Sequence, residues 1–277
     1  MVEQAGPLAL LQDLGRPGYA HLGVSPSGAA DRAAHRLANR LVGNPETAVT
    51  VEVTMGGLVV RATSVAFVAV TGAPTSVTVG DRPTCSHATL ALRPGDRLGI
   101  EPPAAGLRNY LAVRGGILAP ATLGSCARDV LSGLGPEPLR TGDELRTAIP
   151  TEPLPDTDLA PPRPATDVLE LRPGPRRDWF DETAWTTLLD ASWTVSTDLD
   201  RVAARLDGPT LTRRVTGELP SEGLVRGAVQ VPASGQPLVF LADHPVTGGY
   251  PVIAVVTEAS CDRAAQLRPG DRVRFRG

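Results

Sequence analysis

Residues 221–251, SEGLVRGAVQVPASGQPLVFLADHPVTGGYP, combine two apolar stretches with a turn between them and a polar exit. From Leu224 to Pro232 apolar and polar residues alternate, which predicts a strand with one buried face. The five residues 233–237 suit a hairpin loop. The unbroken apolar run Leu238–Ala242 predicts a second strand, covered on both faces. We therefore expect a β-hairpin inside the core of a β domain.

Polar residues cluster in sequence around this hairpin. We expect five of them to converge at one rim of the domain: Glu222, Gln230, Asp243, Thr247 and Tyr250. The adjacent glycines Gly248 and Gly249 would let the backbone approach a ligand closely. A Pro/Gly-rich connection between core strands also carries polar residues without any ligand, so both interpretations stay open at this point.

The remaining chain predicts a mainly β protein with a few short helices. Short Val- and Thr-rich runs between residues 47 and 100 are separated by Gly, Pro and Asp, which is typical of sandwiches and barrels. A clear helix is predicted before Gly43, with Ser27 as N-cap, Asp31 in the first turn and His35 on the surface. Its N-terminus would also be a generic anion site. Two more helices are expected near residues 179–189 and within residues 199–209.

Two features predict two lobes. The run LRPGDRL at residues 92–98 returns as LRPGDRV at residues 267–273, with a fainter TGDEL at 141–145, and each places a Gly-Asp turn before a closing strand. Residues 150–164 contain six prolines and suit an extended spacer. We therefore expect an N-terminal lobe at 1–149, a proline-rich linker at 150–166 and a C-terminal lobe at 167–277.

Composition excludes several classes of protein and chemistry. The net charge is −3 and the pI is near 5.8, which argues against a nucleic-acid or anionic-membrane surface. All 27 basic residues are Arg, so the chain offers no Schiff-base, P-loop or biotinylated lysine. The three cysteines are far apart and suit buried free thiols in a reducing compartment. No signal peptide or membrane span is evident, which favours the cytoplasm.

Individual charged residues carry weaker signals. Asp13 and Arg16 flank a glycine, and they either fix a loop as a local ion pair or present charge to a ligand. Glu52 lies between Val51 and Val53, where a solvated strand face is the usual outcome. The four histidines lack metal-ligand spacing, and no metal site is expected. A GxSxG elbow, a GxxxxGK[ST] loop and an HExxH motif are all absent.

Several motifs together resemble one known family. They are QDLGRPGY (12–19), GVSPSGAAD (23–31) with LANRLVGN (37–44), LAVRGGI (111–117) with LGS (123–125), the whole 221–251 stretch, and AQLRPGDRV (265–273). In this order they are similar to the KipA-type carboxyltransferase family, which includes the C subunit of the bacterial ATP-dependent 5-oxoprolinase. The chain also resembles the carboxyltransferase region of urea carboxylase.

The resemblance implies two cyclophilin-like β-barrel lobes and a KipI-type partner, which is the B subunit of the oxoprolinase, with an A subunit that completes the enzyme. ATP would then be shared with the partner subunits, and biotin is possible only on another chain. The implied reaction converts 5-oxo-L-proline to L-glutamate. Two alternatives stay open: a biotin-dependent carboxyltransferase acting on urea or a related amide, and a non-catalytic regulatory partner of a KipI-type kinase inhibitor.

A planar amide substrate suggests roles for the candidate residues. Carboxylate or amide oxygens would face its N–H, and donors or cations its oxygen. We assign Asp243 and Glu222 as catalytic, with Gln230, on the N–H side. Thr247, Tyr250 and the Gly248-Gly249 backbone would shape the pocket. Arg16 or Arg201 would meet negative charge, and Ser27 and Asp31 would complete the binding set. The family usually has an Arg-Gln-Thr-like run where this chain has His244-Pro245-Val246, which removes a fixed cation.

Overall fold

The predicted hairpin is present in the computed structural model, which describes residues 1–277. Strand β15 (Ala228–Gln230) pairs antiparallel with β16 (Leu238–Phe240), and Val229 lies opposite Val239. The first strand is shorter than predicted, because Gly227 adopts φ +87° and turns the chain. Glu222 and Gly223 instead form β14 (Glu222–Gly223), which pairs with β17 (Thr247–Gly248). The hairpin is therefore confirmed, with a turn where the alternating pattern predicted continuous strand.

The chain divides into two compact units. The first contains residues Met1–Arg16, Asp31–Asp129 and Gly133–Pro164, and the second contains Pro17–Ala30, Val130–Ser132 and Ala165–Gly277. The division differs from the sequence-based one because two short segments from the first half belong to the second unit. The proline-rich run forms no helix or strand, as predicted, but it packs on the first unit: Thr89 N–H donates to the Asp158 carbonyl, and Ala160 N–H to the His87 carbonyl.

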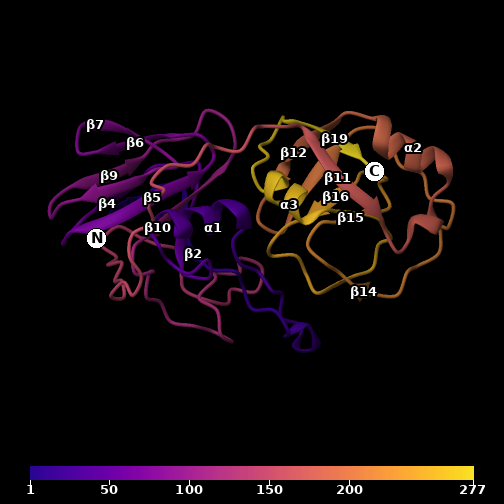
Figure 1. The fold of residues 1–277 in the computed structure, drawn as a ribbon. Coiled ribbons are helices and arrows are strands. Elements are labelled where there is room, and N and C mark those ends of the chain that lie inside the picture. Colours follow the sequence, from indigo (N-terminus) through magenta and orange to yellow (C-terminus); the bar gives the residue numbers. More distant parts are fainter. The chain divides into compact units, whose positions relative to one another are not determined.

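A closed barrel forms the centre of the second unit (Figure 1). In spatial order its strands are β11 (Val168–Pro173), β18 (Val252–Val256), β15, β16, β13 (Ala203–Asp207), β12 (Trp193–Leu199) and β19 (Arg272–Arg276). β11 and β19 pair in parallel, and the other barrel pairs are antiparallel. Closure pairs every strand on both sides and leaves no exposed edge.

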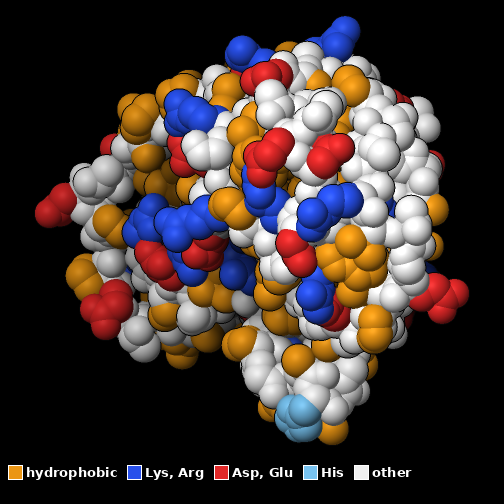
Figure 2. All heavy atoms as spheres, turned by 90° about the vertical axis from the view of Figure 1, so that its right-hand side faces the viewer, with side chains coloured by type: hydrophobic (Ala, Val, Ile, Leu, Met, Phe, Trp, Pro, Cys, Tyr) orange, Lys and Arg blue, Asp and Glu red, His pale blue; other side chains and the backbone are white.

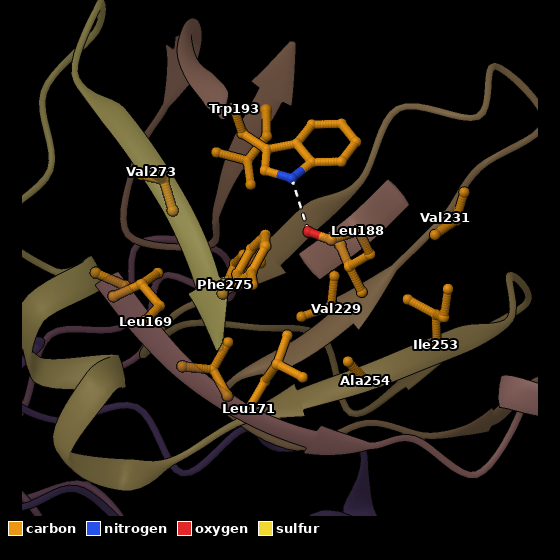
Figure 3. Packing of buried hydrophobic residues seen from close by; sticks show 14 of the residues in the cluster. Leu169, Leu171, Leu188, Trp193, Val229, Val231, Ile253, Ala254, Val273 and Phe275 are labelled. Atoms are coloured by element: carbon orange, nitrogen blue, oxygen red, sulfur yellow. Dashed lines mark hydrogen bonds between the residues drawn. The ribbon is translucent and has the colours of Figure 1, made fainter. Parts of the chain in front are cut away.

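Two helices complete the core of the barrel. α2 (Glu182–Asp190) contacts β19, and α3 (Glu258–Ala264) contacts β11. Figure 3 shows Trp193 packed with aliphatic side chains from the strands, its ring nitrogen donating to the Leu188 carbonyl at 3.1 Å. Trp193 is fully buried, and a truncation of such a side chain to alanine typically costs about 3–5 kcal/mol.

The first unit contains two antiparallel sheets instead of a closed barrel. One sheet has the order β1 (Val2–Ala5), β4 (Leu58–Arg61), β9 (Arg97–Ile100), β6 (Ser76–Val79), β7 (Arg82–Cys85). The other has the order β2 (Leu8–Gln12), β3 (Thr50–Thr54), β10 (Arg108–Val113), β5 (Ala66–Gly72), β8 (Thr89–Leu92). Valine and leucine side chains from both sheets meet in one core. Helix α1 (Arg32–Leu41) packs against β3, β5 and β10.

The three related turns adopt one geometry. In each, an Asp carboxylate accepts the backbone N–H three residues earlier: Asp96 from Arg93 at 2.7 Å, Asp143 from Arg140 at 2.7 Å and Asp271 from Arg268 at 2.8 Å. The glycine before each Asp has φ between 88° and 96°. β9 follows the first turn and β19 the last, so the predicted turn-to-closing-strand unit is confirmed at these two positions.

One predicted helix is a strand, and one helix of the structure was not predicted. Residues 199–209 contain strand β13, not a helix, because Ala204 and Leu206 are buried alternately while the strand pairs with β12 and β16. Helix α3 follows β18 directly and was not predicted. The short 3₁₀ turns η1 (Ala20–Leu22) and η2 (Arg177–Trp179) complete the set of helical elements. The mainly β fold class with a few short helices is confirmed.

Candidate functional site

Asp243 is the centre of a buried polar cluster in the second unit. It ends the apolar run that contains strand β16, and its side chain is fully buried. Its carboxylate accepts four hydrogen bonds: from Ser27 Oγ at 2.6 Å, from Arg201 Nε at 2.9 Å and Nη2 at 3.1 Å, and from the Val130 N–H at 2.9 Å. We call these residues the Asp243 cluster. Because both oxygens already accept two donors, this carboxylate orients its neighbours and offers no vacant position to a substrate N–H.

Ser27 occupies a strained position in that cluster. Its φ is +52°, in the left-handed region that non-glycine residues rarely adopt, and the side chain is buried. Its hydroxyl donates to Asp243, 216 residues away, so Ser27 is not the N-cap that the sequence predicted. The N-cap is Asp31, whose carboxylate accepts the Ala34 N–H at 2.9 Å. A strained residue that surrounding contacts hold in place is typical of functional segments.

A second buried ion pair fixes the same segment. Arg201 Nη2 donates to the Gly28 carbonyl at 2.6 Å, and Arg226 Nη2 donates to the Ala30 carbonyl at 2.6 Å. Arg226 Nη2 also binds Asp262 at 2.8 Å. Two Arg–Asp pairs of the second unit therefore hold two carbonyls of the segment that contains Ser27. Sequence analysis missed both residues, because Arg226 belongs to an alternating strand pattern and Asp262 to helix α3, which was not predicted.

The other predicted residues of the 221–251 stretch lie around the β14–β17 pair. Glu222 is opposite Gly248 and forms a two-contact ion pair with Arg176, while Gln230 Nε2 donates to the Tyr250 carbonyl at 2.8 Å. We call Arg176, Glu222, Gln230, Gly248 and Tyr250 the rim cluster. The Arg176 hydrogen bond holds the pKa of Glu222 below its usual value. Figure 2 shows acidic and basic side chains interspersed on one face of the molecule, without a uniformly basic surface.

Gly248 is required in the rim cluster by close packing. A Cβ at this position would lie 2.8 Å from Gln230 Nε2 and 2.8 Å from Leu224 Cδ1. Thr247, in the same short strand, pairs with Gly223 and is exposed, and Gly249 follows it. Arg213 lies over the Tyr250 ring, 5.7 Å from its centroid. The rim cluster thus presents a cation, an aromatic ring and a half-exposed carboxylate together.

The contacts divide the predicted site residues into three groups. Asp243, Arg201 and Ser27 form one cluster, and Glu222, Gln230, Thr247, Gly248 and Tyr250 surround the short strand pair. Asp31 and Arg16 belong to the first unit, where Asp31 caps α1 and pairs with Arg163 at 3.4 Å. The contacts of Asp243 and those of the rim residues have no partner in common, and the convergence of all five residues at one rim stays a prediction.

His244 is buried and packed at the position where the resemblance led us to expect a cation. Its Nδ1 lies 2.8 Å from the Pro245 carbonyl oxygen, and its ring meets Phe240 edge to face, with centroids 6.5 Å apart. The fixed cation beside Asp243 is Arg201, which lies in the connection between β12 and β13. The position of His244 thus contributes packing, and Arg201 supplies the positive charge beside Asp243.

The first unit contains a second buried polar network, beneath α1. Tyr110 Oη donates to Glu52 at 2.8 Å and accepts the Asp31 N–H at 2.7 Å, while Arg108 lies 3.5 Å from Glu52. Glu52 is fully buried, so the predicted solvated face is wrong: α1 covers that side of the sheet. Burial raises the pKa of Tyr110, with Glu52 and Asp31 adding to the effect.

His35 is also buried, contrary to the predicted surface position. Its Nδ1 lies 2.9 Å from Thr50 Oγ1 and its Nε2 3.0 Å from the Glu46 carbonyl oxygen. Removal from water lowers the pKa of His35 to about 4, despite the opposing effect of the Glu46 carbonyl. At neutral pH the ring is therefore uncharged and bridges α1 to the sheet beneath it.

Three further findings bear on function. All three cysteines are free; Cys261 is buried but Cys85 is exposed, so burial of every thiol was not a correct expectation. No cluster of three or more His, Cys, Asp or Glu side chains is arranged to hold a metal ion. None of the helices has the length and apolar character needed to cross a membrane.

The family model and the related proteins that match this chain all contain a carboxyltransferase region or a 5-oxoprolinase subunit, or are urea amidolyases. Residues 22–277 match the family model described as "Carboxyltransferase domain, subdomain A and B". The chain is 35% identical over 275 residues to the 5-oxoprolinase C subunit of Escherichia coli, covering 98% of this chain and 89% of that protein. It is 30% identical to the urea amidolyase of Lachancea kluyveri, covering 99% of this chain but 16% of that protein.

Solved structures show the same fold. The crystal structure of TTHA0988 superposes with a TM-score of 0.92 at 34% identity, covering 100% of this chain and 55% of that chain, so this chain spans about half of it. The urea amidolyase of K. lactis superposes with a TM-score of 0.92 at 29% identity, covering 99% of this chain and 18% of that chain. The chain belongs to the carboxyltransferase family of subdomains A and B.

Proposed function

We propose that this chain is the C-type subunit of an ATP-dependent 5-oxoprolinase, which converts 5-oxo-L-proline to L-glutamate with a B subunit of the KipI type and with an A subunit. The observation that carries the proposal is the match to two curated C subunits of 5-oxoprolinase, at 35% and 34% identity over 98% and 96% of this chain. Urea amidolyase is less similar, at 30% identity.

The proposed role of the Asp243 cluster is to position a strained backbone segment. Ser27 and Gly28 are held by a buried carboxylate and a buried guanidinium, so their hydroxyl and peptide groups are fixed before a substrate arrives. The Ser27 hydroxyl already donates to Asp243 and the Gly28 carbonyl accepts from Arg201, so this segment would contribute a fixed backbone shape to the site and not a donor for developing negative charge. We therefore revise the direct role predicted for Asp243: its four bound donors make it a positioning residue for Ser27 and Arg201.

The rim cluster supplies the groups that suit the amide itself. Glu222 is half exposed, and its lowered pKa keeps it ionised at neutral pH, so it is able to accept a ring N–H. Gln230, Gly248 and Tyr250 are joined by packing and by the Gln230–Tyr250 hydrogen bond, which would shape the surface beside that carboxylate. The substrate class proposed is a small cyclic amide with a planar N–H and carbonyl.

We propose that ATP binds in the assembled complex and not to this chain alone. The sequence has no lysine and no P-loop, and Arg201 and Arg226 in the second unit are already paired with Asp243 and Asp262. We therefore assign nucleotide binding to the assembled complex and derive no step through it. Biotin likewise has no lysine for attachment here, so any biotin-dependent reaction would need a biotin-carrying partner.

A urea-type carboxyltransferase is the second candidate. It is favoured by the TM-score of 0.92 with K. lactis urea amidolyase over 99% of this chain. The two candidates differ in their partner, because a carboxyltransferase needs a biotin-carrying chain and an oxoprolinase needs A and B subunits.

The deciding experiment is reconstitution. The chain would be co-expressed with A- and B-type partners, and ATP hydrolysis would be measured with 5-oxo-L-proline or urea as the added amide. We expect hydrolysis that depends on 5-oxo-L-proline and on this chain, with glutamate formed in equal amount. Urea-dependent activity together with an avidin-reactive partner would instead support the carboxyltransferase. A tight complex without turnover of either amide would leave a regulatory role and refute the proposal.

A further inference from the structure

Arg213 lies beside the rim cluster and has no carboxylate partner. Its Nη2 donates to the Val231 carbonyl, its guanidinium lies over the Tyr250 ring, and it forms no ion pair. The arginine of the rim cluster, Arg176, is by contrast paired with Glu222. Arg213 therefore brings to this surface a positive charge that the chain itself does not neutralise.

The pKa values of these two arginines move in opposite directions. The hydrogen bond to Glu222 raises the pKa of Arg176, whereas removal from water lowers the pKa of Arg213. The guanidinium of Arg213 has thus lost part of its hydration without gaining a counter-charge. A bound anion would supply that counter-charge.

One side of the Arg213 guanidinium is fixed and the other is accessible. Nε is buried and without a partner, and Nη2 is held by the Val231 carbonyl. Nη1 also makes no hydrogen bond within the chain, but it is not among the buried unpaired atoms, so solvent reaches it. The neighbouring side chains are open as well: Tyr250 is 48% exposed and the Glu222 side chain 30% exposed. A fixed guanidinium with an accessible, unpaired edge is suited to a carboxylate oxygen.

Short contacts within the second unit connect Arg213 to Glu222. Glu222 lies opposite Gly248 in the β14–β17 pair, and Gly248 packs against the Gln230 amide. That amide donates to the Tyr250 carbonyl at 2.8 Å, and the guanidinium of Arg213 lies 5.7 Å from the centroid of the Tyr250 ring. A carboxylate and an unpaired cation therefore belong to the same exposed surface of one unit.

We propose that Arg213 binds the carboxylate of the substrate, with Nη1 as the donor. This rests on the proposed function, in which 5-oxo-L-proline carries a carboxylate on the carbon next to its ring nitrogen. Glu222 would accept the ring N–H while Arg213 meets the carboxylate, so each charge of the surface faces the matching group of the ligand. Of the arginines that the sequence suggested for negative charge, Arg201 already forms a buried ion pair and Arg16 is 1% exposed.

Titration calorimetry of the assembled complex, without ATP, tests the proposal. The ligands are 5-oxo-L-proline and 5-oxo-L-prolinamide, which has the same ring with a neutral amide in place of the carboxylate. The variants are Arg213→Met and the matched control Arg214→Met, an exposed neighbour whose Nη2 also donates to a carbonyl, that of Asp178 at 2.8 Å. We expect the wild type to bind the acid at least tenfold more tightly than the amide. Arg213→Met should raise Kd for the acid at least tenfold and change Kd for the amide less than twofold, and Arg214→Met should match the wild type.

A merely structural Arg213 would give a different result. If it only held the Val231 carbonyl, Arg213→Met would weaken both ligands equally or neither, the preference for the acid would persist, and the proposal would be overturned. Absence of binding to the wild type would overturn it as well. Should Arg213→Met fail to fold, the wild-type complex crystallised with 5-oxo-L-proline decides: a ligand carboxylate within hydrogen-bond distance of Arg213 supports the site, and a ligand elsewhere or absent overturns it.

ATP-dependent turnover, measured on the same samples, separates this proposal from the proposed function. Carboxylate-dependent binding without turnover of 5-oxo-L-proline would refute the proposed function and leave the Arg213 site standing. Turnover with an unchanged KM in Arg213→Met would refute the site and leave the function standing.

Discussion

Replacing Asp243 with asparagine tests the buried cluster most directly. The substitution keeps the shape of the side chain but removes its charge and converts one acceptor oxygen into an amide donor. At the Oδ2 position the amide would face Arg201 Nε and the Val130 N–H, and at the Oδ1 position it would face Arg201 Nη2. In either orientation Arg201 loses a hydrogen bond and the counter-charge of Asp243 while staying buried.

The expected loss follows from this geometry. Leaving one partner of a buried ion pair uncompensated typically costs about 3–5 kcal/mol, a large share of the roughly 5–15 kcal/mol that stabilises a protein. We expect Asp243→Asn to lower the free energy of unfolding of the second unit by that amount and its Tm by roughly 10 °C. Denaturant and calorimetric unfolding measure both quantities, and a barrel probe such as Trp193 fluorescence reports the second unit.

Two controls separate charge loss from general damage. Asp198→Asn removes an exposed partner of Arg205, 3.7 Å apart, and should change stability by less than about 1 kcal/mol. The double variant Asp243→Leu with Arg201→Met removes both charges and should recover part of the lost stability, because no buried charge is left unpaired while the Val130 N–H and the Gly28 carbonyl lose their partners. A loss below about 1 kcal/mol in Asp243→Asn would show that the pair is not buried and saturated as described.

Three other predictions concern single positions. Burial lowers the pKa of His35 from 6.5 to about 4, so the unfolded chain binds a proton at a higher pH than the folded chain does. The contribution of His35 to the free energy of unfolding is therefore full well above pH 6.5 and falls as the pH drops towards 4, by about 2 kcal/mol at pH 5. His35→Gln should remove this part of the pH dependence in unfolding titrations. Gly248→Ala places a Cβ against Gln230 Nε2, so we expect about 1–3 kcal/mol of destabilisation and a raised KM in the reconstituted assay; an unchanged Tm and KM would argue against close packing. Ser27→Ala loses the hydrogen bond to Asp243 but keeps the strain, whereas Ser27→Gly also relieves the strain, so the glycine variant should be more stable by about 1 kcal/mol in chemical denaturation, and the reverse order would disprove the strain.

Short sequence patterns were sufficient to predict the elements whose contacts join neighbouring residues. The apolar run before Asp243 and the turn-forming residues 233–237 predicted the β15–β16 hairpin, because pairing across a short loop involves only neighbouring residues. The same holds for the Gly-Asp turns, in which a side chain binds a backbone group three residues away. The mainly β class followed from these elements.

Distant partners account for most of the errors. Ser27 looked like a helix cap, yet its hydroxyl binds a residue 216 positions later, and no local signal reports that contact. Glu52 looked solvated because alternation describes one face of a strand, and the covering helix α1 comes from an earlier part of the chain. Residues 199–209 have helix-forming composition, but pairing on both sides makes them the strand β13. Tertiary contacts override propensity at each of these positions.

The chain has no lysine, and two of its arginines hold the segment that contains Ser27. Arg201 binds Asp243 through Nε and Nη2 and, through Nη2, also reaches the Gly28 carbonyl, so one planar group joins a carboxylate to a backbone oxygen. Arg226 contacts both the Asp262 carboxylate and the Ala30 carbonyl through Nη2. An ammonium group lacks this planar fork and is more strongly hydrated, so lysine would serve poorly at either buried position. The two guanidinium groups thus convert buried charge into a fixed backbone geometry at Ser27, which is the property that a preorganised site requires.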